Sequence, residues 1–220
     1  MNAPTQPRAP RVLMLGAELG ASASGGGLGT ACAGLAGALV QAGCAVTFVA
    51  PGSVGVGSPP AGVELVHAGE FRRDAAPSGV DVAAGLPGLL RDALEQVADR
   101  AVPLSSYGSR ARDGRDARVL PQALDVYARA VLQVALRGDF DLVYAHDWPT
   151  FPAAEAVKRV LGLPLVCHVH STEVERTPGR PDARILRIES QGFSRADRVV
   201  AVGSRSAELL RQASSSSPER

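Results

Sequence analysis

Short, uninterrupted apolar runs, each followed by a loop rich in small residues, are the feature that most limits what this chain can fold into. The first run, Arg-Val-Leu-Met-Leu-Gly at 11–16, has the continuous hydrophobic character of a strand that is buried on both faces. Comparable runs recur at 45–51, 63–69, 141–146, 163–170 and 198–203. Because segments with helical spacing separate most of these runs, the pattern predicts an α/β fold with a doubly wound parallel sheet.

Helices are expected at 30–43, near 86–100, and at 122–136, 153–161, 183–194 and from the cap residue Ser204 onward. In the first of them, Cys32, Leu35 and Leu39 recur at three- and four-residue spacing, and Gly43 is a suitable stop. Residues 70–120 are polar and rich in turn formers, which indicates an excursion from the sheet. We expect disorder at 1–10 and 213–220, which leaves one domain at 11–212.

Composition narrows the class of protein. The 220 residues include 23 Lys+Arg and 22 Asp+Glu, so no net basic field is present and general nucleic-acid binding is disfavoured. No apolar run reaches the roughly 18 residues of a membrane span, and the first residues resemble neither a signal peptide nor a transit peptide. Cys32, Cys44 and Cys167 are odd in number and lie in apolar segments, which favours core thiols in a reducing cytoplasm.

A glycine-rich loop at 25–29 lies between the first strand and the first helix. Unpaired N–H groups and the helix dipole favour an anion at such a position, and a phosphate is the natural ligand. The loop is not a P-loop, because no Lys-Ser/Thr pair follows, and it fails the dinucleotide fingerprint, because Thr30 stands where glycine is required. Phosphate binding and a tight turn that merely needs glycine both remain open.

The strand at 141–146 ends in polar residues, at the edge of the sheet where this architecture binds ligands. His146 and Asp147 are therefore candidates for a binding site. The alternative is structural: Asp147 would cap the next helix, and Trp148 would pack over the sheet edge.

The strand at 163–170 carries His168 and His170, which the two-residue period of a strand points to one face. His170 lies nearer the strand end and is the better candidate for function, whereas His168 suits a hydrogen-bonded position beneath the site. This pair could ligate zinc with His146 or Glu173, as in a metal hydrolase. Because neither Cys-x-x-Cys nor His-Glu-x-x-His spacing is present, we expect no metal.

Five segments occur in a specific order: GGLG at 26–29, AVTFVAP at 45–51, FDLVYAHDW at 140–148, LPLVCHVHSTE at 163–173 and IESQGFSRADRVVAVGS at 188–204. Considered apart from the other segments, Glu189 is expected to be a solvated or helix-packing carboxylate, and Asp197 is expected to be a turn residue before a strand. Together the segments resemble the amino-terminal domain of retaining glycosyltransferases of the GT-B fold, in the group of glycogen and starch synthases and the family 4 enzymes. The resemblance spans residues 11 to about 212.

This resemblance implies two Rossmann-like domains that face each other across a cleft. The chain would supply the amino-terminal, acceptor-side half of a hexosyltransferase, without the carboxyl-terminal half that holds most of the nucleotide-sugar. We therefore expect the isolated chain to be inactive. The implied substrates are a nucleotide-sugar such as ADP- or UDP-glucose and a glycan or small acceptor, with no metal or other cofactor. Three origins fit: a fragment, an interrupted gene, or a subunit whose partner is a separate carboxyl-terminal chain. A non-catalytic module that binds a glycan or a partner is the alternative.

The resemblance also implies roles for individual residues. Gly26 and Gly27 would approach the donor diphosphate with their backbone N–H groups, and His170 would hydrogen-bond a hydroxyl of the transferred sugar. His146 and Asp147 would line the same cleft near acceptor and sugar hydroxyls. These groups would orient the reactants and stabilise charge, because retention in the family is thought to proceed by front-face attack in which the departing phosphate helps to remove the acceptor proton.

Three further residues are assigned to the cleft or acceptor side. Tyr107 lies in the excursion, where related sequences carry a Pro-Tyr-like segment, Glu173 follows the histidine strand, and Arg176 resembles a basic residue that often comes next. The whole interpretation requires Gly27 and His170 to lie at one crevice.

Overall fold

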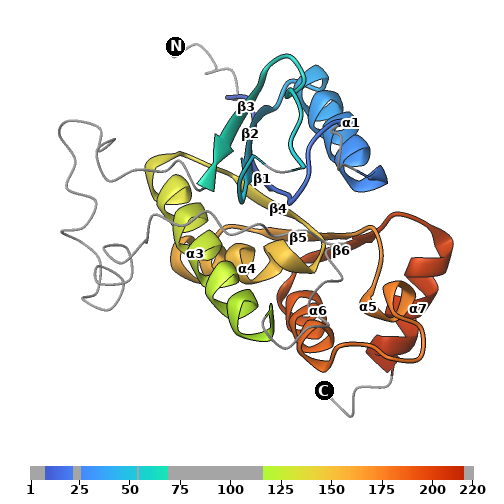
Figure 1. The fold of residues 1–220 in the computed structure, drawn as a ribbon. Helices are drawn as coiled ribbons and strands as arrows, with labels where there is room; N and C mark the ends of the chain where they lie inside the picture. The colour runs from blue at the N-terminus through green and yellow to red at the C-terminus, as the bar shows by residue number, and fades with distance from the viewer. Residues whose placement is uncertain (1–7, 22–25, 54, 69–115, 216–220) are drawn as a thin grey trace, which may run out of the picture.

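The computed structural model describes residues 8–21, 26–53, 55–68 and 116–215 (Figure 1). The elements are β1 (Arg11–Leu15), α1 (Gly27–Gln41), β2 (Ala45–Ala50), β3 (Val63–His67), α3 (Asp116–Arg137), β4 (Leu142–His146), η3 (Trp148–Thr150), α4 (Phe151–Leu161), β5 (Leu165–Val169), α5 (Glu173–Arg176), α6 (Ala183–Arg195), β6 (Arg198–Ala201) and α7 (Ser204–Ser215). Most of the predicted excursion and the helix expected near 86–100 lie outside the described residues.

Six parallel strands form one sheet in the order β3-β2-β1-β4-β5-β6. The chain runs outward from β1 to β3, returns to place β4 on the other side of β1, and then runs outward to β6. This reversal between β1 and β4 is the topological switch point, where doubly wound sheets bind their ligands. The predicted fold class is therefore confirmed.

Alternate side chains of β1 build two cores, one on each face of the sheet. Val12 and Met14 are buried with residues of α1, whereas Leu13 and Leu15 are buried with residues of α3 and α4. Figure 1 shows the same division, with α1 on one face and α3, α4 and α6 on the other. Both faces are covered, which explains why the strand sequences are continuously apolar.

Several predicted helix ends differ from those observed. α1 begins at Gly27 rather than at residue 30, and α3 begins at Asp116, inside the predicted excursion. Pro121 lies within α3 just past its first turn, so the helix lacks the bond that this N–H would donate to Ala117. Ser204 is the first helical residue of α7 rather than its cap, because the carbonyl of Gly203 accepts the first helical bond, from Ala207.

Both ends of the described chain are more ordered than expected. The guanidinium of Arg8 donates to Asp141 at 2.7 Å, and the carbonyl of Pro10 accepts from the amide of Ala45 at 2.8 Å. Residues 8–10 are thereby held against the sheet. At the other end, α7 continues to Ser215, three residues past the predicted domain boundary.

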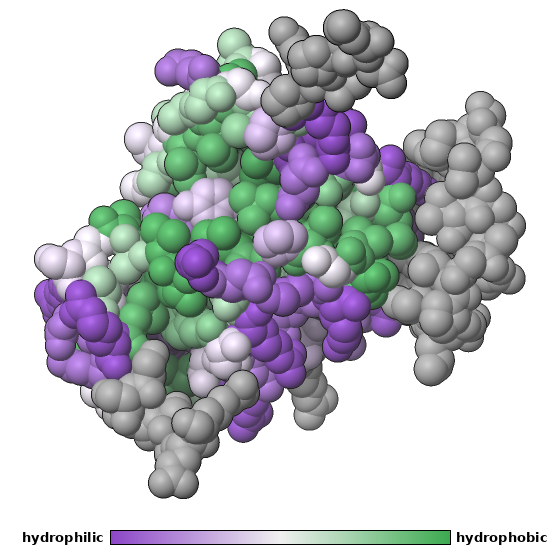
Figure 2. Space-filling view, turned by 180° about the vertical axis from the view of Figure 1, so that it is seen from behind, coloured by the Kyte–Doolittle hydropathy of each residue, from purple (hydrophilic) through white to green (hydrophobic). Residues whose placement is uncertain are grey.

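The surface carries some apolar residues. Among the described residues, the large hydrophobic side chains that are exposed belong to Val174, Val199, Val200 and Val202. Figure 2, seen from behind, shows apolar side chains across the middle of that face, between bands of hydrophilic ones. The helices in the described ranges include none that is long and apolar enough to cross a membrane. All three cysteines are free thiols, as expected.

Candidate functional site

The candidate site lies at the carboxyl ends of β1, β4 and β5, beside the start of α1. Ligand atoms of Cys32 in α1, His146 at the end of β4 and His170 after β5 all lie within 4.8 Å of one another. Gly27 is five residues before Cys32, which corresponds to about 7.5 Å along the helix axis. Gly27 and His170 therefore lie at the same edge of the sheet, as the resemblance requires.

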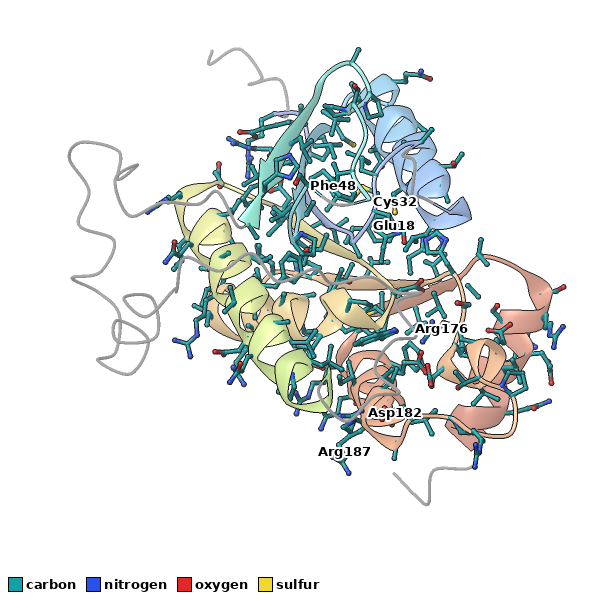
Figure 3. The ribbon with its side chains drawn as sticks, in the orientation of Figure 1. Glu18, Cys32, Phe48, Arg176, Asp182 and Arg187 are labelled. Atoms are coloured by element: carbon teal, nitrogen blue, oxygen red, sulfur yellow. The ribbon has the colours of Figure 1, made fainter. Side chains whose placement is uncertain are left out.

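The start of α1 already faces an internal anion. Gly26 is the N-cap residue, and its N–H donates to Oε2 of Glu18 at 3.2 Å. Glu18 is buried, and Figure 3 shows it near Cys32 at the start of the helix. The expectation that this helix start attracts negative charge is correct in kind, but the carboxylate of Glu18 holds the N–H of Gly26. Sequence reasoning missed this residue, although an acidic side chain in the loop between the first strand and the glycines was a usable signal.

Packing separates the two interpretations of the glycine loop. A Cβ at Gly29 would lie 2.6 Å from the carbonyl oxygen of Gly20, so this position requires glycine for close contact. A Cβ at Gly26 would approach only Oε2 of Glu18, at 4.0 Å, and one at Gly27 would meet nothing within 4 Å. Close contact with the Gly20 backbone, rather than a tight turn, explains Gly29, whereas packing does not explain Gly26 or Gly27.

We expect Gly29→Ala to lower the free energy of unfolding by about 1–3 kcal/mol, because the new methyl group must push the Gly20 backbone away. Gly34→Ala is the matched control in the same helix, since its Cβ would meet nothing within 4 Å. That variant should be more stable than the wild type by about 0.5–1 kcal/mol, because alanine is the better helix former. Urea denaturation measures both effects, and equal changes would contradict the close contact.

Three histidines and a tyrosine form one cluster of rings. The hydroxyl of Tyr144 is hydrogen-bonded to Nδ1 of His168 at 3.0 Å, and Nδ1 of His146 is hydrogen-bonded to Nε2 of His170 at 3.0 Å. The rings of His168 and His170 stack with centroids 4.3 Å apart. The prediction that these two side chains share a face is confirmed, and His168 is a hydrogen-bonded histidine as expected.

Burial keeps the imidazoles uncharged. It lowers the pKa of His146 well below its usual value, an effect that His168 and His170 reinforce. Burial, followed by the charge of His168, lowers the pKa of His170 to about 4, and burial also lowers the pKa of His168. At neutral pH the cluster therefore offers neutral ring nitrogens, which bind hydroxyl groups rather than transfer protons as imidazolium ions.

Asp147 holds the end of β5 in place. Its Oδ1 accepts from the amide of His170 at 2.7 Å, and its own amide donates to the carbonyl of His168 at 2.9 Å. The carboxyl group is buried, which raises the pKa of Asp147 to about 6 against the effect of the His170 N–H. Its backbone has φ 59° and ψ 167°, a conformation that disfavours every residue except glycine.

The structural alternative for this segment holds only in part. Asp147 is the N-cap residue of η3, but its side chain makes no capping bond. Trp148 is buried in the core rather than over the sheet edge. Asp147 and His146, which we expected to line the cleft, are both buried, with exposures of 1% and 0%. Their observed contacts position His170.

Arg176 and Glu173 are not free to face a cleft either. The guanidinium of Arg176 contacts Glu189 at 2.7 Å and Glu173 at 3.4 Å, with exposed side-chain fractions of 9%, 5% and 4% for the three residues. Arg176 also donates to the carbonyl of Ser171, and the amide of Glu173 donates to Glu189 at 2.8 Å. This ionic cluster ties the segment after His170 to α6 (Figure 3).

Sequence reasoning missed this cluster. Glu189 was expected to be solvated or to pack between helices, yet it is the buried partner of Arg176. The α5 helix was also missed, although Thr172 and Glu175 form a capping box, a sequence pattern that indicates the start of a helix. Asp197 does lie at a turn before β6, where it accepts from the amide of Leu165 at 2.7 Å. Tyr107 lies outside the described residues.

Glu189→Gln should change how stability depends on pH. Burial outweighs the attraction of Arg176 and raises the pKa of Glu189 to about 7. The folded protein then binds this proton more tightly than the unfolded chain, so the wild type loses stability between about pH 4.5 and 7 as the group ionises. Relative to the wild type, the variant should gain roughly 3 kcal/mol across this window.

Urea denaturation at pH 5 and pH 8 measures the change. Glu208→Gln, at an exposed glutamate of α7, is the control and should follow the wild-type curve. Parallel curves for Glu189→Gln and the wild type would show that the carboxyl group titrates normally.

The metal candidates differ from those suggested by the sequence. Cys32, His146 and His170 are brought together, whereas the set considered from sequence contained His168 and Glu173 in place of the cysteine. Nε2 of His146 and Oδ2 of Asp147 are buried without a hydrogen-bond partner in the described part of the chain.

A six-stranded parallel sheet with such a site at its switch point is the architecture of one half of a GT-B glycosyltransferase. Residues 25–220 match Glycosyltransferase Family 4, and the chain belongs to this family. It is 33% identical over 112 residues to D-inositol 3-phosphate glycosyltransferase 1 of Catenulispora acidiphila, a match that covers 48% of this chain and 26% of the relative. It is 54% identical over 37 residues to the uncharacterized glycosyltransferase YqgM of Bacillus subtilis, with 17% and 10% covered.

Among solved structures, sucrose-phosphate synthase from Thermosynechococcus elongatus is similar with a TM-score of 0.61 at 15% sequence identity. The superposition covers 92% of this chain and 45% of that one, and it supports the fold. The matches thus span less than half the length of each of these relatives.

Proposed function

We propose that this chain is the acceptor-side half of a retaining hexosyltransferase, similar to glycogen and starch synthases, that uses a nucleotide-sugar donor. The observation that carries the proposal is the convergence of His170, its partner His146 and the anchoring carboxylate of Asp147 at the switch point, beside the start of α1. The donor would be a nucleotide-sugar such as ADP- or UDP-glucose, and the acceptor a glycan or a small molecule.

His170 is the residue that contacts the transferred sugar in this proposal. It is half-buried, whereas His146 and Asp147 are fully buried behind it. Its low pKa leaves it neutral, which suits a hydrogen bond to a sugar hydroxyl. Orientation and charge stabilisation would then be the contribution of this half, while the departing phosphate removes the acceptor proton.

The start of α1 would face the donor diphosphate. Packing does not explain Gly26 or Gly27, so their missing side chains leave the backbone open to a close ligand. Because the carboxylate of Glu18 accepts from Gly26, the diphosphate would approach on the side of Gly27 or displace Glu18.

A second half would complete the enzyme. Because the matches cover 26% and 45% of two longer relatives, we infer that most donor contacts come from further polypeptide, either in the same chain or in a separate one. These 220 residues would then be inactive alone. The three free thiols agree with a reaction in a reducing cytoplasm.

The test joins this chain to the donor-binding half of a family 4 enzyme and supplies excess ADP- or UDP-glucose with glucans and small acceptors. Transfer with retained anomeric configuration is the expected result. No transfer to any acceptor would contradict the proposal. Glycan binding that survives both His170→Ala and Gly27→Ala, without a response to nucleotide, would instead indicate a binding module.

A further inference from the structure

Cys32, His146 and His170 form a cluster with the composition of a transition-metal site. One sulfur and two ring nitrogens lie within 4.8 Å of one another. A tetrahedral zinc site with Zn–N of about 2.0–2.1 Å and Zn–S of about 2.3 Å places its ligand atoms about 3.3–3.6 Å apart. Side-chain movements of about 1 Å would therefore bring the three atoms to bonding distance.

The three ligands are held by rigid elements that approach from different directions. Cys32 lies in α1, His146 ends β4, and His170 follows β5, where its amide is bonded to Asp147. Nδ1 of His146 and Nε2 of His170 are already 3.0 Å apart and share one proton. A cation can replace this proton with a small widening of the pair.

The surroundings favour a dication. Asp147 and Glu18 are buried carboxylates whose charges both act on Cys32. Oδ2 of Asp147 and Nε2 of His146 have no partner in the described residues, although both are buried. Buried polar atoms without partners are rare, and a bound cation would give Oδ2 of Asp147 the positive charge that it lacks.

We propose that Cys32, His146 and His170 bind Zn²⁺, with the fourth coordination position open toward the half-buried side of His170. Sulfur with two imidazoles is a ligand set that zinc prefers, and three protein ligands with one open position are a common arrangement for it. Binding breaks the S–H bond of Cys32, and the proton leaves to solvent as the thiolate binds the metal.

The site has a consequence for activity that rests on the proposed function. The ligand atoms must move by about 1 Å to bind the cation, and a displacement of His170 by that distance can cost about 100-fold in transfer. Zn²⁺ would therefore inhibit the transferase rather than assist it.

The experiment titrates the untagged, chelator-treated chain with Co²⁺ as a spectroscopic probe. One equivalent should produce thiolate-to-cobalt charge-transfer absorption, and Zn²⁺ should displace the cobalt. Cys32→Ser should abolish this absorption and weaken Zn²⁺ binding by about 100-fold or more. Cys44→Ser is the matched control, because Cys44 lies outside the cluster, and it should keep wild-type absorption.

His170→Asn provides an independent test, because it removes a second ligand at a half-buried position instead of at the buried position of Cys32 in α1. This variant should also lose the cobalt site. No charge-transfer absorption in the wild type, or wild-type absorption in Cys32→Ser or His170→Asn, would overturn the proposal. Cobalt binding without any glycosyl transfer by the completed enzyme would refute the proposed function and leave the metal site intact.

Discussion

His170→Ala should reduce glycosyl transfer by the completed enzyme by about 100- to 1000-fold, the loss that follows removal of one well-placed hydrogen-bond donor at a reaction centre. The reason is geometric. The ring is fixed by Nδ1 of His146 at 3.0 Å, by stacking on His168 and by the bond from its amide to Asp147, so no other side chain can take its place. Steady-state kinetics with a nucleotide-sugar measure the effect, which should appear mainly in kcat.

The matched control is His67→Ala. His67 is in β3, at the opposite edge of the sheet from β6, with two strands between it and β4. This variant should keep nearly all transfer activity. Equal losses in the two variants would mean that His170 contributes to the fold rather than to the reaction.

Substitution of Asp147 should cause the second largest loss of glycosyl transfer, although Asp147 acts through His170. Asp147→Ala and Asp147→Gly both remove the acceptor for the His170 amide, and displacement of His170 by about 1 Å can cost about 100-fold in transfer. Asp147→Asn keeps an acceptor oxygen and should restore most of the activity. This rescue distinguishes a positioning residue from one that must carry charge.

The Asp147 variants should also differ in their free energy of unfolding, and glycine and alanine should not be equivalent there. Because φ is 59° at Asp147, glycine relieves backbone strain that alanine retains. Asp147→Gly should therefore be more stable than Asp147→Ala by about 1–2 kcal/mol, as measured by urea denaturation. Asp125→Ala, at an exposed carboxylate of α3, is the control and should change neither quantity appreciably. Equal stability of the Gly and Ala variants would contradict the strain.

Local sequence patterns were sufficient to predict the strands of the sheet. The runs at 11–15 and 45–50 are apolar on both faces because helices cover both sides, so their character could be read without knowing their neighbours. The histidines at 168 and 170 were placed on one face by the two-residue period of a strand. Helix ends were less accurate, because Gly27, Gly29 and Pro121 have low helix propensity although all three are helical in the structure.

The contacts of the buried polar and charged residues could not be predicted from the sequence. Cys32 and Glu189 carry no local sign of their neighbours, which lie 114 and 13 residues away in His146 and Arg176. Arg176 and Glu173 were expected at the cleft because the family resemblance assigned them to it. Their burial depends on a guanidinium that meets two carboxylates across α5 and α6.

The amino-acid sequence by itself determined the parallel α/β sheet, its family and the strand ends that carry the candidate residues, because hydrophobic periodicity and loop chemistry are local properties. Only the tertiary structure decided which of those residues face the crevice and which support it. The physical reason is that burial and pairing are set by residues distant in sequence: Asp147 anchors His170, Glu189 pairs with Arg176, and Cys32 lies beside two histidines.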